Sequence, residues 1–292
     1  MLLVFGFGYT SQVFLDQAGS RFERVVATVR SPAKVASLPK GGATMRLFPG
    51  DQDELAADVA ASEAMLVSVP PGPGGDPVLA CFAEAIASAP ALRWVGYLST
   101  VGVYGDHAGD WVDEATPTRP TSARSRERVA AEEAWLRLGR TSGKPVQVFR
   151  LAGIYGPGRS AFDRLADGTA KRLVKPGQVF NRIHVEDIAA VLLASLDRPR
   201  AGAIYNVTDD EPAPPQDVIA HAARLAGVPP PPEQPFDAAE LSPMARSFYG
   251  ENKRVGNVLI RGELGVALRY PTYREGLGAL TPRSGSRSGR NS

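Results

Sequence analysis

Short apolar runs rich in β-branched residues recur along the first two thirds of the chain, and segments with helical spacing separate them. The apolar runs have the length and composition of strands buried on both faces, and they occupy 2–5, 24–29, 64–69, 93–99 and 146–155. The helical segments between them are 11–18, 53–62, 77–88 and 126–138. This alternation predicts an α/β fold of Rossmann type, a doubly wound parallel sheet with helices on both faces.

The pattern changes in the last third of the chain, where nine of the 25 prolines fall within 212–243 and the regular alternation stops. A helix over 184–196 is expected to connect the two parts. The expected division is a Rossmann domain over 1–155 with 181–206 returning to it, and a smaller C-terminal substrate lobe formed by 156–180 and 207–280.

The strongest local motif is the turn Gly6-Phe7-Gly8-Tyr9-Thr10-Ser11, which follows the first predicted strand and opens a helix. In a phosphate-binding turn, Gly6 permits the tight bend, Gly8 lets the backbone approach a pyrophosphate, and the helix N–H groups face the anion. Ser11 stands where a third glycine would allow close packing, which implies a slightly wider contact of helix and strand. The alternative is an ordinary glycine turn between a strand and a helix.

The end of the second predicted strand bears on the choice of cofactor. Arg30 and Ser31 occupy the place where an acidic residue would bind the ribose 2′-hydroxyl of NAD, and a guanidinium suits the 2′-phosphate of NADP. We therefore expect NADP, with NAD as the alternative; Arg30 and Lys34 could instead be ordinary solvated charges. Asp51 could accept a hydrogen bond from the adenine amino group or cap the following helix. The segment 68–70 is expected to line the adenosine ribose.

Four further motifs, taken with their order and spacing, are similar to a known superfamily. They are STVGVYG at 99–105, RLAGIYGPG at 150–158, RIHVEDIA at 182–189 and IYNV at 204–207. Over residues 1 to about 210 the chain resembles the extended short-chain dehydrogenases/reductases, the NAD(P)-dependent epimerase/dehydratase group. The glycine turn and the segment 264–277 resemble an atypical branch of that superfamily.

Active members of the superfamily use a Ser or Thr together with a Tyr-x-x-x-Lys pair on one helix, in which the ammonium lowers the phenol pKa. Thr100 matches the Ser/Thr position. The resemblance places Arg124 where the tyrosine belongs and Arg128 where the lysine belongs. No register shift restores the motif, because the chain has no tyrosine strictly between residues 104 and 155. The usual proton transfer is therefore not expected.

Arginine remains protonated and is a poor proton donor, but it binds anions well. Arg124 and Arg128, one helical turn apart, could grip a phosphate or a carboxylate, and Arg128 could hold a ribose hydroxyl. The alternative is a solvated helix face on which Arg128 pairs with Glu132. Tyr104 could supply a phenol near Thr100, although it belongs to a Val-Tyr-Gly string that is structural in the superfamily.

The candidate residues can be stated together. The catalytic candidates are Thr100, Tyr104, Arg124 and Arg128. The cofactor-binding candidates are Gly6, Gly8, Tyr9, Thr10, Ser11, Arg30, Ser31, Asp51, Ser68, Val69, Pro70, Ser99, Arg128 and Leu151. Outside these sets, His184 is expected to make a structural hydrogen bond, Asp187 to mark a helix start, and Cys81 to pack on the buried face of a helix.

Composition narrows the classes of function. A single cysteine excludes an intramolecular disulfide framework, and with three scattered histidines no metal site is expected. The net charge of +2 comes from the last twelve residues, which hold three arginines and no acid and are expected to form a disordered tail. We expect no nucleic-acid partner and no membrane segment, a cytoplasmic protein with a small-molecule substrate, and we leave a homodimer open.

The leading hypothesis is an NAD(P)-dependent oxidoreductase or epimerase-like enzyme that acts on a small polar or anionic substrate without the usual Tyr/Lys pair. The alternative is a non-catalytic NADP(H)-binding regulator or scaffold, and a third, weaker reading is a nucleic-acid binder. Fold alone cannot separate an enzyme from a binding module, because function lies in the site. A closed, polar, substrate-sized cleft beside Thr100 would favour the enzyme, whereas a filled or flat site would favour the binding module.

Overall fold

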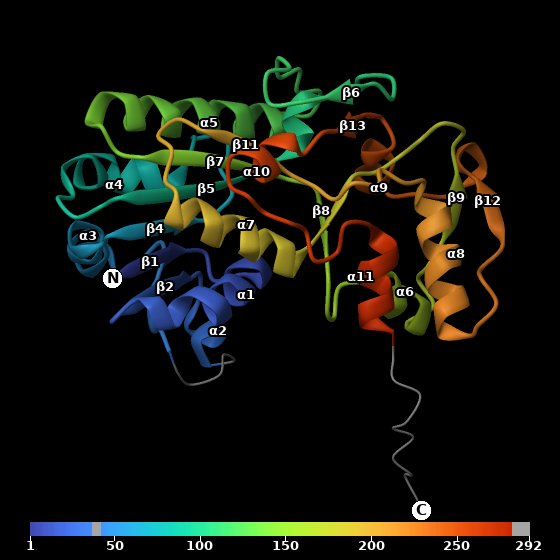
Figure 1. Cartoon of the computed structure of the whole chain (residues 1–292), viewed down its shortest axis with the longest axis horizontal. Helices are drawn as coiled ribbons and strands as arrows, with labels where there is room; N and C mark the ends of the chain where they lie inside the picture. Colours follow the sequence, from blue (N-terminus) through green and yellow to red (C-terminus); the bar gives the residue numbers. More distant parts are fainter. Residues whose placement is uncertain (37–41, 282–292) are drawn as a thin grey trace, which may run out of the picture.

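The computed structural model describes residues 1–36 and 42–281. Seven strands make a parallel sheet: Leu2–Phe5 (β1), Val25–Val29 (β2), Thr44–Leu47 (β3), Ala64–Val67 (β4), Trp94–Thr100 (β5), Val146–Leu151 (β7) and Ile204–Val207 (β11). Their order is β11-β7-β5-β4-β1-β2-β3, and every pairing is parallel (Figure 1). The order reverses between β1 and β4, so the prediction of a doubly wound Rossmann-type sheet is confirmed.

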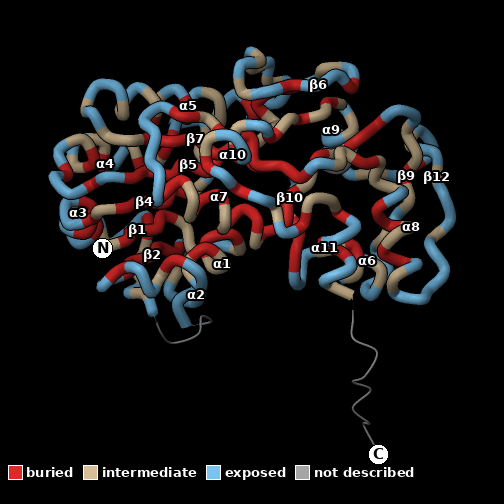
Figure 2. The backbone as a smooth tube through the Cα atoms, in the orientation of Figure 1, coloured by how far each residue is buried: buried red, intermediate tan, exposed pale blue. Residues whose placement is uncertain are grey.

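Helices cover both faces of this sheet. They are Tyr9–Ala18 (α1), Pro32–Ala36 (α2), Gln52–Ala61 (α3), Pro77–Ser88 (α4), Ala123–Ser142 (α5) and Val185–Asp197 (α7). One apolar layer packs α1 and α7 against the sheet, and a second packs α3, α4 and α5 against the other face. Apart from those of β3, most residues of these strands are buried and are drawn red in Figure 2. The core therefore fixes the carboxyl ends of the strands.

The sequence located these elements closely, with one error of strand assignment. β1 has its predicted bounds, while α1 begins two residues earlier than predicted and α5 extends beyond both predicted ends. The single strand predicted over 146–155 is wrong: the chain breaks at Ala152, and Gly153–Tyr155 (β8) leaves the sheet to pair with Arg182–His184 (β10). The break directs the chain away from the sheet and toward the C-terminal elements.

A second group of elements packs around its own apolar cluster, apart from the sheet (Figure 1). It consists of Ala161–Ala166 (α6), Arg172–Val174 (β9), Pro215–Ala226 (α8), Glu233–Pro235 (β12), Phe236–Ala238 (η3), Pro243–Phe248 (α9) and Tyr273–Leu280 (α11). We call this group the C-terminal elements. The exact division into domains stays a prediction.

Five short elements lie outside these two groups, and β6 pairs with β13. They are Gly19–Arg21 (η1), between α1 and β2, and Val101–Tyr104 (η2), Trp111–Val112 (β6), Arg254–Val255 (β13) and Val258–Gly262 (α10). Within the described part of the chain, no helix has the length and apolar character that crossing a membrane requires. The tail predicted to be disordered lies, from residue 282 onward, outside the described residues.

Candidate functional site

The turn after β1 has the geometry that its glycines predict. Gly6 has φ +94°, and a Cβ added there would lie 3.2 Å from the backbone nitrogen of Val69. Its own N–H donates to Thr28 Oγ1 at 2.9 Å. The buried Ser11 hydroxyl donates to the Gly6 carbonyl at 2.8 Å. Ser11 thus holds the turn by a hydrogen bond, and only glycine combines this φ with this close approach.

The N-terminus of α1 is open toward the solvent side of the turn. Gly8 stands at the N-cap position without a side-chain cap, and, its chain neighbours aside, no atom of the described residues lies within 4 Å of where its Cβ would be. The first N–H groups of a helix lack intrahelical acceptors, so this end suits a pyrophosphate. Thr10 is buried behind the turn. The Tyr9 hydroxyl donates to the Pro157 carbonyl at 3.0 Å and so links the turn to the segment after β8.

The neighbouring strand ends carry the other predicted nucleotide contacts. Arg30 is exposed directly after β2, and the half-buried Ser31 accepts a hydrogen bond from the Lys34 N–H. Asp51 precedes α3, but its carboxylate accepts from the Leu47 N–H at 2.8 Å and makes no helix cap. The capping alternative is therefore wrong, because this carboxylate closes the turn after β3 instead.

At the carboxyl end of β4, Ser68 and Val69 are half-buried beside the glycine turn, and Pro70 is exposed. Pro70 also lines the large cavity described next. Ser99 and Leu151 lie at the ends of β5 and β7 but are buried, and neither lines this cavity. The structure thus brings the glycine turn and 68–70 together and keeps Ser99 and Leu151 beneath that surface.

A cavity of about 1480 Å³ runs from the carboxyl ends of the central strands to the C-terminal elements. Thr100, at the end of β5, and Arg124 and Arg128, on α5, line it on the sheet side. Three of the four catalytic candidates therefore line one cavity, with Thr100 from a strand end and the two arginines from one helix motif. Its volume exceeds the usual range for small-molecule sites, which leaves room for a substrate beside a dinucleotide.

Thr100 and Arg128 are held at this edge by short-range contacts. Thr100 Oγ1 accepts from the Gly102 N–H at 3.1 Å. Arg128 Nη1 donates to the Tyr97 hydroxyl at 3.0 Å and to the Leu98 carbonyl at 2.9 Å. Burial raises the pKa of the Tyr97 phenol above its ordinary value, with the Arg128 guanidinium opposing the rise. Arg128 is therefore partly engaged by the protein, whereas Arg124 is exposed at the rim.

Tyr104 belongs to a buried network beneath the cavity rather than to its wall. Its hydroxyl donates to Asn206 Oδ1 at 2.7 Å and accepts from Arg150 Nη1 at 2.9 Å, and the residue is fully buried. Arg150 also binds the Glu132 carboxylate at 2.8 Å. The pairing of Arg128 with Glu132 considered from the sequence is thus wrong, because Glu132 turns inward to Arg150. Ser99 donates to the same carboxylate.

Three residues outside the candidate sets can also be placed. His184 caps α7, because its Nδ1 accepts a hydrogen bond from the Glu186 N–H at 3.2 Å. The predicted structural hydrogen bond is therefore confirmed. Burial lowers the pKa of this imidazole to about 4. Asp187 lies in the first turn of α7 as predicted, and its carboxylate also binds the Arg269 and Tyr270 amides. Cys81 is exposed, so its predicted burial is wrong: Phe82 and Ile86, not Cys81, take the inner face of α4.

Cations outnumber acids in the cavity wall. The cations are Arg124, Arg128, Arg159, Arg164, Lys171, Arg182 and Lys253, and the acids are Glu127, Asp163 and Glu251. Two of the acids are already engaged: Asp163 forms the capping box of α6 with Ser160, and Glu251 pairs with Lys253 at 2.7 Å. The wall therefore presents a net positive charge to a ligand.

Sequence reasoning missed the wall residues that face the C-terminal elements. They are chiefly Arg159 and Arg164 around α6, Arg182 on β10 and Tyr249 after α9. No spacing rule connects such positions. One signal was present: Arg182 adjoins the buried Ile183 and His184, and a charged residue there must face either a partner or a cavity.

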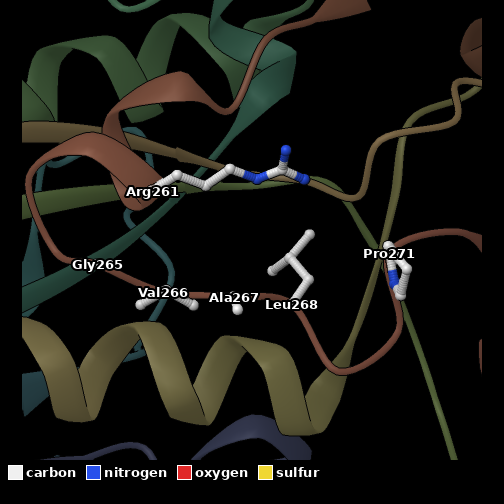
Figure 3. A pocket seen from close by; sticks show the side chains of 6 residues that line it. All are labelled: Arg261, Gly265, Val266, Ala267, Leu268 and Pro271. Atoms are coloured by element: carbon white, nitrogen blue, oxygen red, sulfur yellow. The ribbon is translucent and has the colours of Figure 1, made fainter.

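A second, smaller hollow of about 420 Å³ lies elsewhere, where the segment after α10 runs beside α7 (Figure 3). Arg261 extends over it and pairs with Asp210. It contains no residue of the glycine turn or of the Thr100 cavity. Among the residues that the structure describes, no group of three or more histidine, cysteine or acidic side chains is arranged to hold a metal ion.

The fold and the site together define a Rossmann-type dinucleotide-binding protein with a cavity at the carboxyl edge of its sheet. Residues 82–208 match the model of the NAD dependent epimerase/dehydratase family. The chain is 31% identical over 229 residues to Protein YeeZ of Escherichia coli (strain K12), with 76% of each chain covered. It therefore belongs to the NAD dependent epimerase/dehydratase family.

Two other similarities extend over different lengths of the chain. A structure of a conserved protein of unknown function from Silicibacter pomeroyi DSS is 54% identical, with a TM-score of 0.88 over 96% of this chain and 97% of that one. A 3-diazoavenalumate denitrifying reductase from Streptomyces sp is 31% identical over 144 residues, or 45% of each chain.

Proposed function

We propose that the protein is an NADP(H)-dependent oxidoreductase or epimerase-like enzyme that acts on a small polar or anionic substrate. The observation that carries this proposal is the 1480 Å³ cavity, which begins at Thr100 and Pro70 beside the dinucleotide turn and is lined mainly by cations among its charged groups. A filled or flat site would have favoured a regulator or scaffold, and the site is neither. The similarity to a protein that is named a reductase adds support.

The described residues fit a dinucleotide. Gly6 and Gly8 leave room for the pyrophosphate at the N-terminus of α1, and the segment 68–70 borders the ribose position. When bound, the nicotinamide ring would supply or accept a hydride. The chain's own contribution is to hold the substrate carbon close to that ring and to limit the access of water.

Thr100 is the group that would orient the substrate oxygen, because it lines the cavity and, among the described residues, its hydroxyl oxygen accepts one hydrogen bond, from the Gly102 N–H at 3.1 Å. The sequence of α5 contains neither tyrosine nor lysine. In this proposal the proton therefore comes from water or from a side chain of the C-terminal elements. Arg124 and Arg128 stay charged and contribute electrostatic attraction instead.

Turnover is tested by a screen of NADPH against aldehydes, ketones and nucleotide sugars, with Thr100→Val, Thr100→Ser and, as a matched control, Thr141→Ala on the exposed end of α5. We expect Thr100→Val to lower kcat at least about tenfold, the loss expected for one transition-state hydrogen bond. Thr100→Ser and the control should retain activity. Failure of NADPH to bind at near-millimolar concentration would refute the proposal.

The preference for NADP rests on Arg30, which is exposed at the end of β2 where a 2′-phosphate would lie. Arg30→Ala should weaken NADPH binding about tenfold, the value of one charge-assisted hydrogen bond, and should leave NADH binding unchanged. Equal losses for both nucleotides would show that Arg30 does not select between them.

A further inference from the structure

Three side chains from distant parts of the sequence meet in the cavity wall: Arg164 on α6, Arg182 on β10 and Tyr249 just after α9. Burial raises the pKa of the Tyr249 phenol, and the positive charges of Arg164 and Arg182 oppose that rise. Burial also lowers the pKa of Arg182, and the charge of Arg164 lowers it further. The two guanidiniums and the phenol therefore lie within electrostatic reach of one another.

Arg182 is fixed in place with part of its donor capacity unused. Its Nη1 donates to the Phe180 carbonyl at 2.9 Å and to the Ala213 carbonyl at 3.1 Å. Within residues 1–36 and 42–281, its other guanidinium N–H groups have no hydrogen-bond acceptor, and neither Arg164 nor Arg182 forms a salt bridge. Two cations within electrostatic reach of one another, neither of them in a salt bridge within the described residues, favour the binding of an anion.

Asp209 is the acidic residue that acts most strongly on Arg182, but its burial limits how far it can neutralise the arginine. Asp209 is buried, and burial raises its pKa to about 8, with Arg182 opposing the rise and Asp210 and Glu211 adding to it. One of its oxygens is buried without a hydrogen-bond partner among the described residues. Burial thus favours the protonated form of this carboxyl, which reduces the compensation that it gives to the Arg182 charge.

The wall around this cluster is apolar and partly aromatic. The Phe180 ring meets the Tyr249 ring edge to face, with centroids 5.2 Å apart and an interplanar angle of 86°. Leu173 and Val218 line the cavity as well, and Phe248 does so although 60% of its surface is exposed. Apolar side chains left in contact with a cavity are a feature of small-molecule sites, where they contact the ligand body.

We propose that the cavity contains a subsite for an anionic group, a carboxylate or a phosphate, that is carried on an aromatic body. The anion binds between the Arg164 and Arg182 guanidiniums with the Tyr249 hydroxyl as a further donor, and the aromatic body lies against Phe180 and its apolar neighbours. This inference deepens the proposed function, on which it rests, by naming the class of its substrate.

The test is calorimetric titration of the full chain with phenyl phosphate, benzoate and inorganic phosphate, in the presence and absence of NADPH. Arg164→Gln is the principal variant, because Arg164 is exposed and makes no side-chain hydrogen bond within the described part of the chain. Tyr249→Phe removes only the hydroxyl. Arg137→Gln, exposed on α5 outside the cavity, is the matched control. Arg182 is left intact because it anchors two carbonyl groups.

We expect one of the two aromatic anions to bind saturably, and the stronger of the two identifies phosphate or carboxylate as the preferred group. Arg164→Gln should weaken that binding at least about tenfold and Tyr249→Phe about threefold, while Arg137→Gln has no effect. Inorganic phosphate should bind at least about tenfold more weakly than phenyl phosphate, since it lacks the apolar body.

The subsite would be overturned if neither aromatic anion bound, or if the native protein and Arg164→Gln bound the preferred anion with equal affinity. Inorganic phosphate binding as tightly as phenyl phosphate would overturn the aromatic part. Failure of the subsite can be told apart from failure of the proposed function, because NADPH affinity is measured in the same titrations. Loss of NADPH binding with Arg164-dependent anion binding would refute the function and support the subsite.

Discussion

Arg150 lies in the core beneath the catalytic edge, and Arg182 lies in the wall of the cavity, yet both guanidiniums are largely removed from bulk water. Arg150 meets an internal carboxylate, Glu132, at 2.8 Å, and the bonds to Glu132 raise its pKa although burial opposes this. Arg182 donates to two carbonyl groups, and it lies within electrostatic reach of Arg164 and of Asp209, an acid whose pKa burial raises. The comparison teaches that an arginine whose partner is internal stabilises the fold, whereas one without an internal carboxylate is available to a ligand.

Among the substitutions, the largest loss of stability is expected where the internal pair is broken. Glu132→Ala should lower the free energy of unfolding by about 3–5 kcal/mol, because it leaves the Arg150 charge buried and uncompensated. Urea denaturation measures this, with Glu133→Ala, exposed on the same helix, as a control that should change stability by less than about 0.5 kcal/mol. A small loss in Glu132→Ala would mean that Arg150 readily finds another partner.

Asp209 should make stability depend on pH. Its folded pKa of about 8 lies above the ordinary value of 3.8, so folding favours the protonated form. This contribution is fully present below about pH 4 and is lost as the pH rises to about 8, with a slope of up to about 1.4 kcal/mol per pH unit. Denaturation of the native protein and Asp209→Asn across this range measures it. Parallel pH profiles for the two proteins would show that Asp209 ionises at neutral pH and compensates Arg182.

The glycine turn should show an intermediate effect. Gly6→Ala should cost about 1–3 kcal/mol of stability, because alanine is strained at φ +94° and its methyl group would crowd the Val69 backbone. It should also weaken NADPH binding at least about tenfold. Thermal denaturation and calorimetry measure the two effects, and Gly143→Ala, also at positive φ but in open space, separates strain from crowding. Unchanged NADPH affinity in Gly6→Ala would remove the turn from the nucleotide site.

The smallest stability effect is expected in the cavity. Arg164→Gln should leave the free energy of unfolding within about 0.5 kcal/mol of the native value, because Arg164 has no salt bridge or side-chain hydrogen bond within residues 1–36 and 42–281. It should nevertheless weaken anion binding. Urea denaturation of this variant beside Glu132→Ala tests the comparison directly, and a large loss of stability in Arg164→Gln would show that its role is structural.

The centre of the sheet was predictable because strands such as β1 and β4 are continuous apolar runs, and β1 has its predicted bounds. Gly6 and Gly8 were predictable because a local motif encodes a local turn. The partner of Glu132 was not predictable, since the helix offered Arg128 four residues away whereas the fold brings Arg150 from a neighbouring strand. Cys81 was misplaced because helical spacing alone does not fix which side of an alanine-rich helix faces the sheet.

The cavity itself depends on tertiary structure throughout. Arg164, Arg182 and Tyr249 come from three segments that no periodicity connects, and their proposed role depends on neither arginine forming a salt bridge within the described residues. A sequence shows which charges exist, but it does not show which of them the fold will neutralise. This explains why the Arg124 and Arg128 candidates were found through a helix motif, and the cations on the opposite wall were missed.

The most direct test of the account is NADPH consumption with a matched pair of substrates, an aromatic aldehyde that carries a carboxylate and its neutral parent. The account predicts a kcat/KM at least about tenfold higher for the carboxylate-bearing aldehyde, and loss of this advantage in Arg164→Gln. Equal rates for the two aldehydes, or no consumption of bound NADPH with either, would contradict it.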